Sequence, residues 1–273
     1  MTALPMNSRS TRPAHDKACL WHSPLSSVSA WQSRTAYRAG LAKVRHARGL
    51  LFDLDNVLCD ATSWWRWLVQ LVTRMGLATD YDTFYGDWRT SYLREVQSGR
   101  REQAEALETF LRSKGLSRGQ VDEIEAAGHA RRRELDCGMR PLPGVRQTLA
   151  TIEARGMPMG VLADADMPAI GLCQRLAQMG IERRFCAVIS SFDLERTKPD
   201  AACYLAALAR LELPPEQVAY VGHRGEDVRG AADVGMPTIA FNHDPEARAD
   251  VYLERFTDLL MVLDTAPLSA AAG

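Results

Sequence analysis

The sequence has no apolar run that approaches the roughly 18 residues of a membrane-spanning helix, and its charges nearly cancel. The 33 Lys and Arg residues and the 34 Asp and Glu residues leave a formal net charge of −1 over 273 residues. A chain with so little net charge has no global attraction for nucleic acid or for an anionic membrane. We therefore predict neither of these as a partner.

Closely spaced cysteines are also missing. The six cysteines are scattered along the chain, and no two of them form the C-x-x-C pair that is typical of zinc sites and redox motifs. This pattern predicts reduced thiols and a cytoplasmic location rather than a disulfide framework.

Acidic residues are nearly absent from residues 1–47, where Asp16 is the only one. Arg, Lys and Ser are frequent in this stretch, and apolar periodicity is weak. We predict a basic, Ser-rich, mobile N-terminal extension, with room for a short helix through residues 36–45. An organelle-targeting peptide has the same composition and is kept as an alternative.

Apolar residues recur every three or four positions between residues 61 and 137, which indicates helices. Glycines at the ends of these periodic stretches are typical helix stops, and Ser117 followed by Gln120 fits a capping box. The pattern predicts an all-helical insert over residues 61–137.

Short apolar runs alternate with helical patterns after residue 138, which predicts a parallel sheet covered on both faces. The expected strands are 159–163, 187–189, 218–221 and 238–241, and the expected helices are 145–155, 168–179, 200–211, 226–234 and 253–262. An apolar run that ends at Asp53 supplies the first strand of the same sheet. We therefore predict an α/β fold, a Rossmann-like parallel sheet over residues 48–60 and 138–265, with a tail over residues 266–273.

Polar clusters follow the predicted strands where each strand ends. Asp53 and Asp55 end the first strand, and residues 163–166, 197–200 and 222–227 follow later elements. Because parallel strands share one carboxyl edge, these groups should converge where open α/β sheets bind ligands. Two carboxylates at such an edge can divide nucleophilic attack and proton transfer between them.

The run Asp53-Leu54-Asp55-Asn56-Val57 resembles the first motif of the haloacid dehalogenase-like (HAD) superfamily. Thr197-Lys198-Pro199-Asp200 resembles the third motif, and Gly222-His223 with Asp227 resembles the fourth. The similarity covers residues 48–263, and the helical insert stands where many members carry a helical cap that selects the substrate. The resemblance implies a Rossmann-like fold and, most often, a Mg²⁺-dependent phosphatase.

Residue roles follow from the resemblance, motif by motif. It implies that Asp53 is the nucleophile that forms an aspartyl-phosphate, that Asp55 protonates the leaving group and activates water, and that Lys198 neutralises phosphoryl oxygens. Mg²⁺ is expected on Asp53, the Asp55 carbonyl and Asp227. The expected substrate-binding residues are Asn56, Ala163 and Asp164.

Two positions depart from the family pattern. Ala163 stands where the second motif usually has Ser or Thr, and His223 stands where the fourth motif usually has Asp. Imidazole is a poorer ligand for Mg²⁺ than carboxylate, so both changes should weaken or redirect phosphate turnover. They leave open a HAD-shaped pseudoenzyme or regulatory binding module.

Other family activities are less favoured. Asp55 argues against a dehalogenase, which generally lacks this second acid, and Lys114 is the only lysine of the insert that could serve phosphonatase chemistry. A phosphomutase is kept as a further alternative. We predict a phosphatase that acts on a small phosphorylated metabolite.

Overall fold

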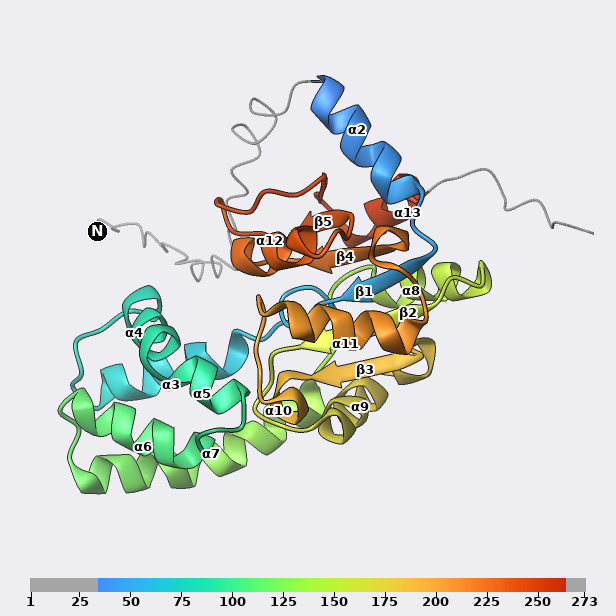
Figure 1. Cartoon of the computed structure of the whole chain (residues 1–273). Helices are drawn as coiled ribbons and strands as arrows, with labels where there is room; N and C mark the ends of the chain where they lie inside the picture. Colours follow the sequence, from blue (N-terminus) through green and yellow to red (C-terminus); the bar gives the residue numbers. More distant parts are fainter. Residues whose placement is uncertain (1–33, 264–273) are drawn as a thin grey trace, which may run out of the picture.

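The computed structural model describes residues 34–263, and these form a six-stranded, all-parallel sheet with an inserted group of helices (Figure 1). The strand order is β3-β2-β1-β4-β5-β6. The strands are β1 Gly49–Phe52, β2 Met159–Ala163, β3 Ala187–Ser190, β4 Val218–Gly222, β5 Thr238–Phe241 and β6 Val251–Leu253. The predicted α/β class is confirmed, and the strand order reverses between β1 and β4, where such sheets bind ligands.

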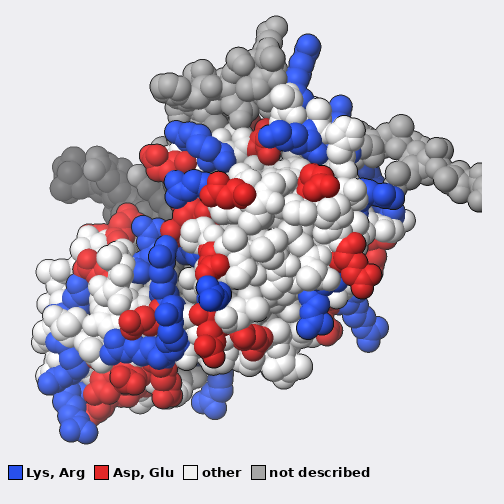
Figure 2. Space-filling view, viewed as in Figure 1, with Lys and Arg blue, Asp and Glu red and all other residues white. Residues whose placement is uncertain are grey.

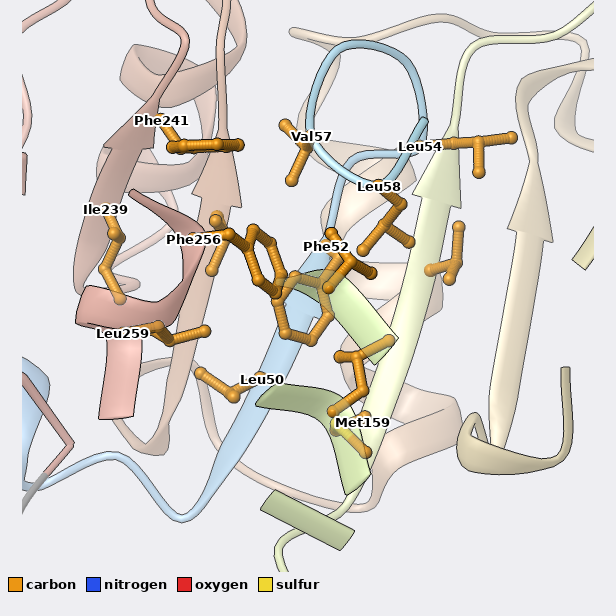
Figure 3. Close-up of a cluster of buried hydrophobic side chains, with 14 of the residues drawn as sticks. Leu50, Phe52, Leu54, Val57, Leu58, Met159, Ile239, Phe241, Phe256 and Leu259 are labelled. Carbon is orange, nitrogen blue, oxygen red and sulfur yellow. The ribbon is translucent and has the colours of Figure 1, made fainter. Parts of the chain in front are cut away.

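The side chains of β1 alternate between two hydrophobic clusters, one on each face of the sheet. Leu50 and Phe52 pack on the face that carries α8 (Val145–Ala154), α9 (Ala169–Gln178) and α13 (Leu259–Val262) (Figure 3). Leu51 packs on the other face, with α11 (Ala201–Leu211) and α12 (Gly225–Asp233). Because β1 is buried on both faces, its carboxyl end is held rigidly.

The helices between β1 and β2 form a group with a hydrophobic cluster of its own, beside the sheet in Figure 1. They are α3 Ser63–Arg74, α4 Tyr81–Trp88, the π-helical turn η1 Arg89–Leu93, α5 Arg94–Gln97, α6 Gln103–Ser113 and α7 Arg118–Gly138. The predicted capping box is present, with the Gln120 N–H donating to Ser117 Oγ and the Ser117 N–H donating to Gln120 Oε1. We call residues 61–137 the helical insert.

The structure differs from the predicted mobile extension over residues 34–47. Helix α2 (Arg34–Arg45) packs on the sheet domain, with Val44 fully buried and Lys43 Nζ 3.0 Å from Asp250 Oδ1. A Cβ atom at Gly40 would lie 2.3 Å from the Asp250 carbonyl oxygen, so only glycine permits this approach. The sequence did not indicate this packing because only a few residues of α2 make the contact, and its apolar periodicity is therefore weak. The earlier residues, with the alternative of a targeting peptide, and the tail over residues 266–273 lie outside the described residues.

The helix predicted over residues 253–262 is wrong in its first part. Val251–Leu253 forms β6, which pairs with β5 at the edge of the sheet. A single turn of 3-10 helix (Phe256–Asp258) follows, and α13 begins only at Leu259. The partner strand supplies backbone hydrogen bonds that no local pattern could reveal. None of the helices within residues 34–263 has the length and apolar character to cross a membrane.

Candidate active site

Asp53 lies at the carboxyl end of β1, next to the point where the strand order reverses. It is 3% exposed, and its Oδ1 lies 2.7 Å from Lys198 Nζ and accepts a hydrogen bond from the Leu54 N–H at 2.9 Å. Burial raises the pKa of Asp53, but the charge of Lys198 and the neighbouring His223 outweigh it and hold this pKa well below its ordinary value. Asp53 is therefore a carboxylate at neutral pH, the form that a nucleophile needs.

Lys198 stands in the loop before α11, and its ammonium group is completely enclosed. Besides Asp53, its Nζ lies 3.3 Å from Asp227 Oδ2 and donates hydrogen bonds to Tyr220 Oη at 3.2 Å and to the Leu162 carbonyl at 3.4 Å. Burial lowers the pKa of Lys198, but the charges of Asp227 and Asp53 raise it above its ordinary value. The structure thus holds a charged lysine between one acid that follows β1 and one in the first turn of α12.

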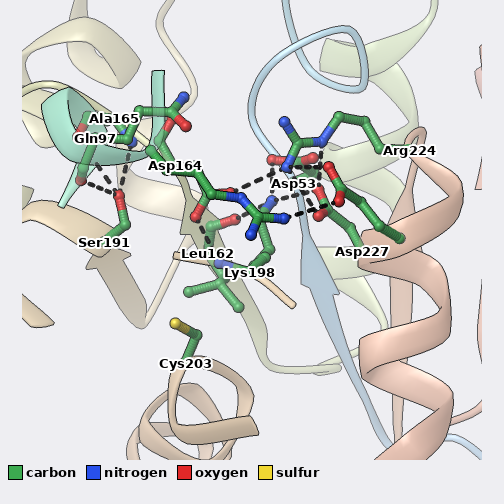
Figure 4. A network of polar contacts seen from close by, with 12 residues as sticks. Asp53, Gln97, Leu162, Asp164, Ala165, Ser191, Lys198, Cys203, Arg224 and Asp227 are labelled. Carbon is green, nitrogen blue, oxygen red and sulfur yellow. Dashed lines mark hydrogen bonds and ion pairs between the residues drawn. The ribbon is translucent and has the colours of Figure 1, made fainter. Parts of the chain in front are cut away.

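Arg224, in the loop after β4, joins two of the predicted site acids (Figure 4). Its Nε lies 3.2 Å from Asp227 Oδ2, and its Nη2 lies 3.0 Å from Asp227 Oδ1 and 3.4 Å from Asp164 Oδ2. Asp164 also accepts a hydrogen bond from the Lys198 N–H at 3.0 Å. Burial raises the pKa of Asp164 to about 7 although both cations oppose this.

His223 faces the nucleophile candidate from the end of β4. Its Nδ1 lies 3.3 Å from Asp53 Oδ2, and its Nε2 lies 3.4 Å from the amide nitrogen of Asn56. Asn56 has φ of 57°, a left-handed conformation that Asn adopts more readily than most residues. The residue that departs from the fourth motif therefore stands directly against Asp53.

Asp55 lines a cavity of 530 Å³ between the sheet edge and the helical insert. Burial, with the charge of Asp53 adding to it, raises the pKa of Asp55. The insert and the sheet domain contribute aromatic and cationic side chains to the cavity, namely Trp64, Trp65, Tyr85, Trp88, Arg131, Arg132 and Arg175. Figure 2 shows basic side chains gathered where the insert meets the sheet domain, with acidic ones among them.

The helical insert contacts the loops of the site through α5. The Gln97 side chain donates a hydrogen bond to the Asp164 carbonyl at 2.9 Å, and the Gln97 carbonyl accepts one from Ser191 Oγ at 2.6 Å. Arg94 Nη2 also lies 3.2 Å from Glu226 Oε2. The position of the insert is thus tied to the loop that follows β2.

The structure brings the predicted residues Asp53, Lys198, Asp164 and Asp227 into one network. Ala163 ends β2, is 2% exposed and offers no side-chain hydrogen bond to a ligand.

Sequence reasoning missed Arg224, Tyr220 and Gln97 as members of this network. Arg224 could have been noticed, since it lies three residues before Asp227 in a loop already chosen as functional. Tyr220 lies inside a strand and Gln97 inside a helix, where no motif distinguishes them.

The donor set does not fit the Mg²⁺ that the resemblance implies. Mg²⁺ requires near-octahedral oxygen ligands, and the carboxylates of Asp53 and Asp227 already lie against cationic side chains. Both oxygens of Asp227 are engaged by Arg224, and Lys198 also approaches one of them. His223 adds a nitrogen donor where a carboxylate would be needed.

The parallel sheet, with a cluster of acids and a lysine at its switch point, defines a Rossmann-like α/β architecture, and comparison with known proteins specifies the family. A model of haloacid dehalogenase-like hydrolases matches residues 47–235. The chain therefore belongs to the haloacid dehalogenase-like hydrolases.

Three similar proteins illustrate the range of this family. A phosphoglycolate phosphatase of Yersinia pestis is 24% identical over 228 residues, which are 81% of this chain and 94% of that protein. A glyceraldehyde 3-phosphate phosphatase of Methanothermobacter thermautotrophicus is 29% identical over 132 residues, 48% of this chain and 58% of that protein. The crystal structure of an L-2-haloacid dehalogenase has a TM-score of 0.63 at 22% identity, covering 80% of this chain and 98% of that one. At that identity the structural likeness concerns the fold.

Proposed function

We propose that this protein is a phosphatase that hydrolyses a small phosphorylated metabolite through an aspartyl-phosphate on Asp53. The observation that carries the proposal is the buried Asp53–Lys198 pair at the switch point of the sheet, with Oδ1 and Nζ 2.7 Å apart. An anionic nucleophile can approach an anionic phosphoryl group only if cations lie beside both. The phosphatase names of the Yersinia and Methanothermobacter relatives support the same reaction class.

In the first proposed step, an oxygen of Asp53 attacks phosphorus and the bond from phosphorus to the ester oxygen breaks. The leaving oxygen takes the electron pair of that bond together with a proton from Asp55. The raised pKa of Asp55 favours the protonated acid that this step requires. Lys198 neutralises charge on the phosphoryl oxygens throughout.

In the second proposed step, Asp55, now a carboxylate, takes a proton from a water molecule as that water attacks phosphorus. The bond between phosphorus and Asp53 breaks, and inorganic phosphate leaves. Asp164 would position Arg224 rather than touch the phosphoryl group, Asn56 would position His223, and Ala163 would offer only its backbone. Mg²⁺ has no part in these steps because the donor set does not fit it.

We further propose that the helical insert is a cap that selects the substrate, and that residues 48–60 and 138–265 form the domain beneath it. The 530 Å³ cavity between them supports this, since Asp55 lines it from the sheet side and Trp64 and Arg131 line it from the insert. Four arginines line the cavity, and three of them lie against acids that line it too. The wall therefore carries charges of both signs and is suited to a small polar substrate. The free thiols of the five cysteines within residues 34–263 are in keeping with the proposed cytoplasmic location.

The decisive experiment is phosphate release from a panel of phosphorylated metabolites by the wild-type protein and by Asp53→Asn. Because a neutral amide cannot attack phosphorus, we expect a loss of about 10⁴-fold or more with the fold intact by circular dichroism. Retained turnover in Asp53→Asn would refute the covalent mechanism.

A pseudoenzyme that binds phosphorylated ligands is the second candidate. It is favoured by the closed network in which Asp53, Asp164 and Asp227 all have internal cationic partners. Saturable binding of a metabolite without phosphate release, in both the wild type and Asp53→Asn, would select it.

A further inference from the structure

Asp227 is the acid that the fourth motif would offer to a metal, and its carboxylate is already fully engaged. Arg224 meets both of its oxygens in a fork, with Nε 3.2 Å from Oδ2 and Nη2 3.0 Å from Oδ1. Two parallel charge-assisted contacts are the strong form of the arginine–carboxylate pair. Since Asp227 is only 1% exposed, a divalent cation could reach it only by displacing the guanidinium.

Arg224 is held in this place by more than one acid. Its Nη2 lies 3.4 Å from Asp164 Oδ2 and 3.3 Å from Glu226 Oε1. Glu226 in turn lies 3.2 Å from Arg94 of the helical insert. Carboxylates from the loops after β2 and β4 thus fix a positive charge at the edge of the sheet where Asp53 stands.

His223 lies against the other carboxylate oxygen of Asp53. Its Nδ1 lies 3.3 Å from Asp53 Oδ2, while Lys198 lies against Oδ1. Each oxygen of Asp53 therefore lies close to a nitrogen atom, and an imidazole nitrogen would serve Mg²⁺ less well than a carboxylate oxygen. Lys198 also lies against Asp227, so one ammonium group meets both acids.

We propose that the Arg224 guanidinium takes the position that a divalent cation would need in this site, so that the protein holds its phosphoryl group with Lys198 and Arg224 and works without a bound metal. The metal-exclusion part stands on the geometry alone, and the catalytic part rests on the proposed phosphatase function. The guanidinium is permanently charged and has more N–H donors than the two that meet Asp227, so it can also donate to a phosphoryl oxygen. It brings one positive charge where Mg²⁺ would bring two.

The test is direct titration of the full-length protein with Mn²⁺, followed by electron paramagnetic resonance of the free ion. We expect no saturable binding by the wild type up to about 10 mM. The double variant His223→Asp with Arg224→Ala frees Asp227 and restores the acid, and it should bind Mn²⁺ at least about 10-fold more tightly. Arg229→Ala, at an exposed arginine of the same helix, is the matched control and should behave as the wild type.

Two results would overturn the inference. One is saturable Mn²⁺ binding by the wild type as tight as that of the double variant. The other is a folded double variant that still binds no Mn²⁺, because Arg224 and His223 would then not be what excludes the metal. Circular dichroism checks folding, and His223→Asp with Arg224→Gln, which keeps a hydrogen-bonding side chain beside Asp227, serves as the second variant.

The catalytic part is tested by phosphate release with and without a chelator. We expect wild-type turnover to change by less than about twofold with the chelator, and Arg224→Gln to lower turnover by about 10²-fold. Loss of wild-type activity in the chelator would overturn this part. If no metabolite is hydrolysed at all, the proposed phosphatase function fails, and the Mn²⁺ comparison still decides whether Arg224 excludes a metal.

Discussion

The sheet edge and the helical insert differ in the kind of side chains that they bury. At the sheet edge, Asp53, Lys198, Asp227 and Arg224 satisfy one another at distances of 2.7 to 3.3 Å. In the insert, aromatic rings fill the core, and the indole nitrogens of Trp64 and Trp88 are buried with no hydrogen-bond partner in the structure. The edge thus holds paired charged groups, whereas the insert presents aromatic rings and unused indole N–H donors beside the cavity. We infer that chemistry belongs to the edge and substrate choice to the insert.

The sharpest way to test that division is to remove a proton donor at the edge. Asp55→Asn should lower phosphate release by about 10²–10⁴-fold, since general acid–base catalysis contributes about that much. Asp60→Asn is the matched control, because Asp60 lines the same cavity but is exposed. Steady-state kinetics on one substrate measures both, and equal losses in the two variants would contradict the role of Asp55.

A large effect on the insert alone is expected from Trp88→Ala. Trp88 is 1% exposed and packs against Trp65, Tyr92 and Phe110. Replacing a buried aromatic ring by Ala leaves a cavity and should cost about 3–5 kcal/mol of local stability. Hydrogen exchange should rise in α3 to α6 and stay low in β1, β2 and β4.

The matched variant is Ile152→Ala, in the core of the sheet domain. It should raise hydrogen exchange in β1, β2 and β4 and leave it low in α3 to α6. Uniform exchange through the whole chain in both variants would show that the two hydrophobic clusters unfold together.

A smaller, pH-dependent effect is expected from Asp164. Burial raises its pKa to about 7 in the folded protein, above the ordinary value for an aspartate. Between these two values the folded state binds a proton that the unfolded state does not. The stability of the wild type relative to Asp164→Asn should therefore fall, by on the order of 1 kcal/mol or more, as the pH rises from about 4 to about 7.

Urea unfolding at several pH values measures this difference for Asp164→Asn. A stability difference that stays constant with pH would mean that the pKa of Asp164 is the same in the folded and the unfolded protein, contrary to this prediction.

The smallest effect should come from the contact that joins the two regions. Gln97→Ala removes the hydrogen bond from the insert to the Asp164 carbonyl, which is worth about 0.5–1.5 kcal/mol. We expect a change of KM of about 2- to 10-fold with kcat nearly unchanged, because the reacting groups stay in place. The comparison is Gln103→Ala. Gln103 also lies on the cavity wall, but its side chain accepts a hydrogen bond from Arg132 within the insert and does not reach the sheet domain. A large loss of kcat in Gln97→Ala would mean that the insert takes part in the chemical step.

Much of the sheet domain could be predicted because its signals are local. Strands β2 and β5 lie at their predicted positions, and Asp53 was expected at the end of the first strand. The loops around Lys198 and Asp227 were expected beside it, because parallel strands place their carboxyl ends at one edge. A short helix within residues 36–45 was expected, and α2 is present there. Its packing on the sheet domain and the strand β6 were not predicted, since both depend on contacts with distant partners such as Asp250 and β5.

The sequence by itself determined the class of fold, the helical insert and the motif residues that mark the family, because periodicity and short motifs record what each segment buries and exposes. Only the tertiary structure decided how the charges at the edge are paired. His223 was visible as a missing carboxylate, but the fork of Arg224 on Asp227 and its contact with Asp164 were not. Which ion a carboxylate can bind depends on the groups that already surround it, and those groups come from loops that are far apart in the sequence.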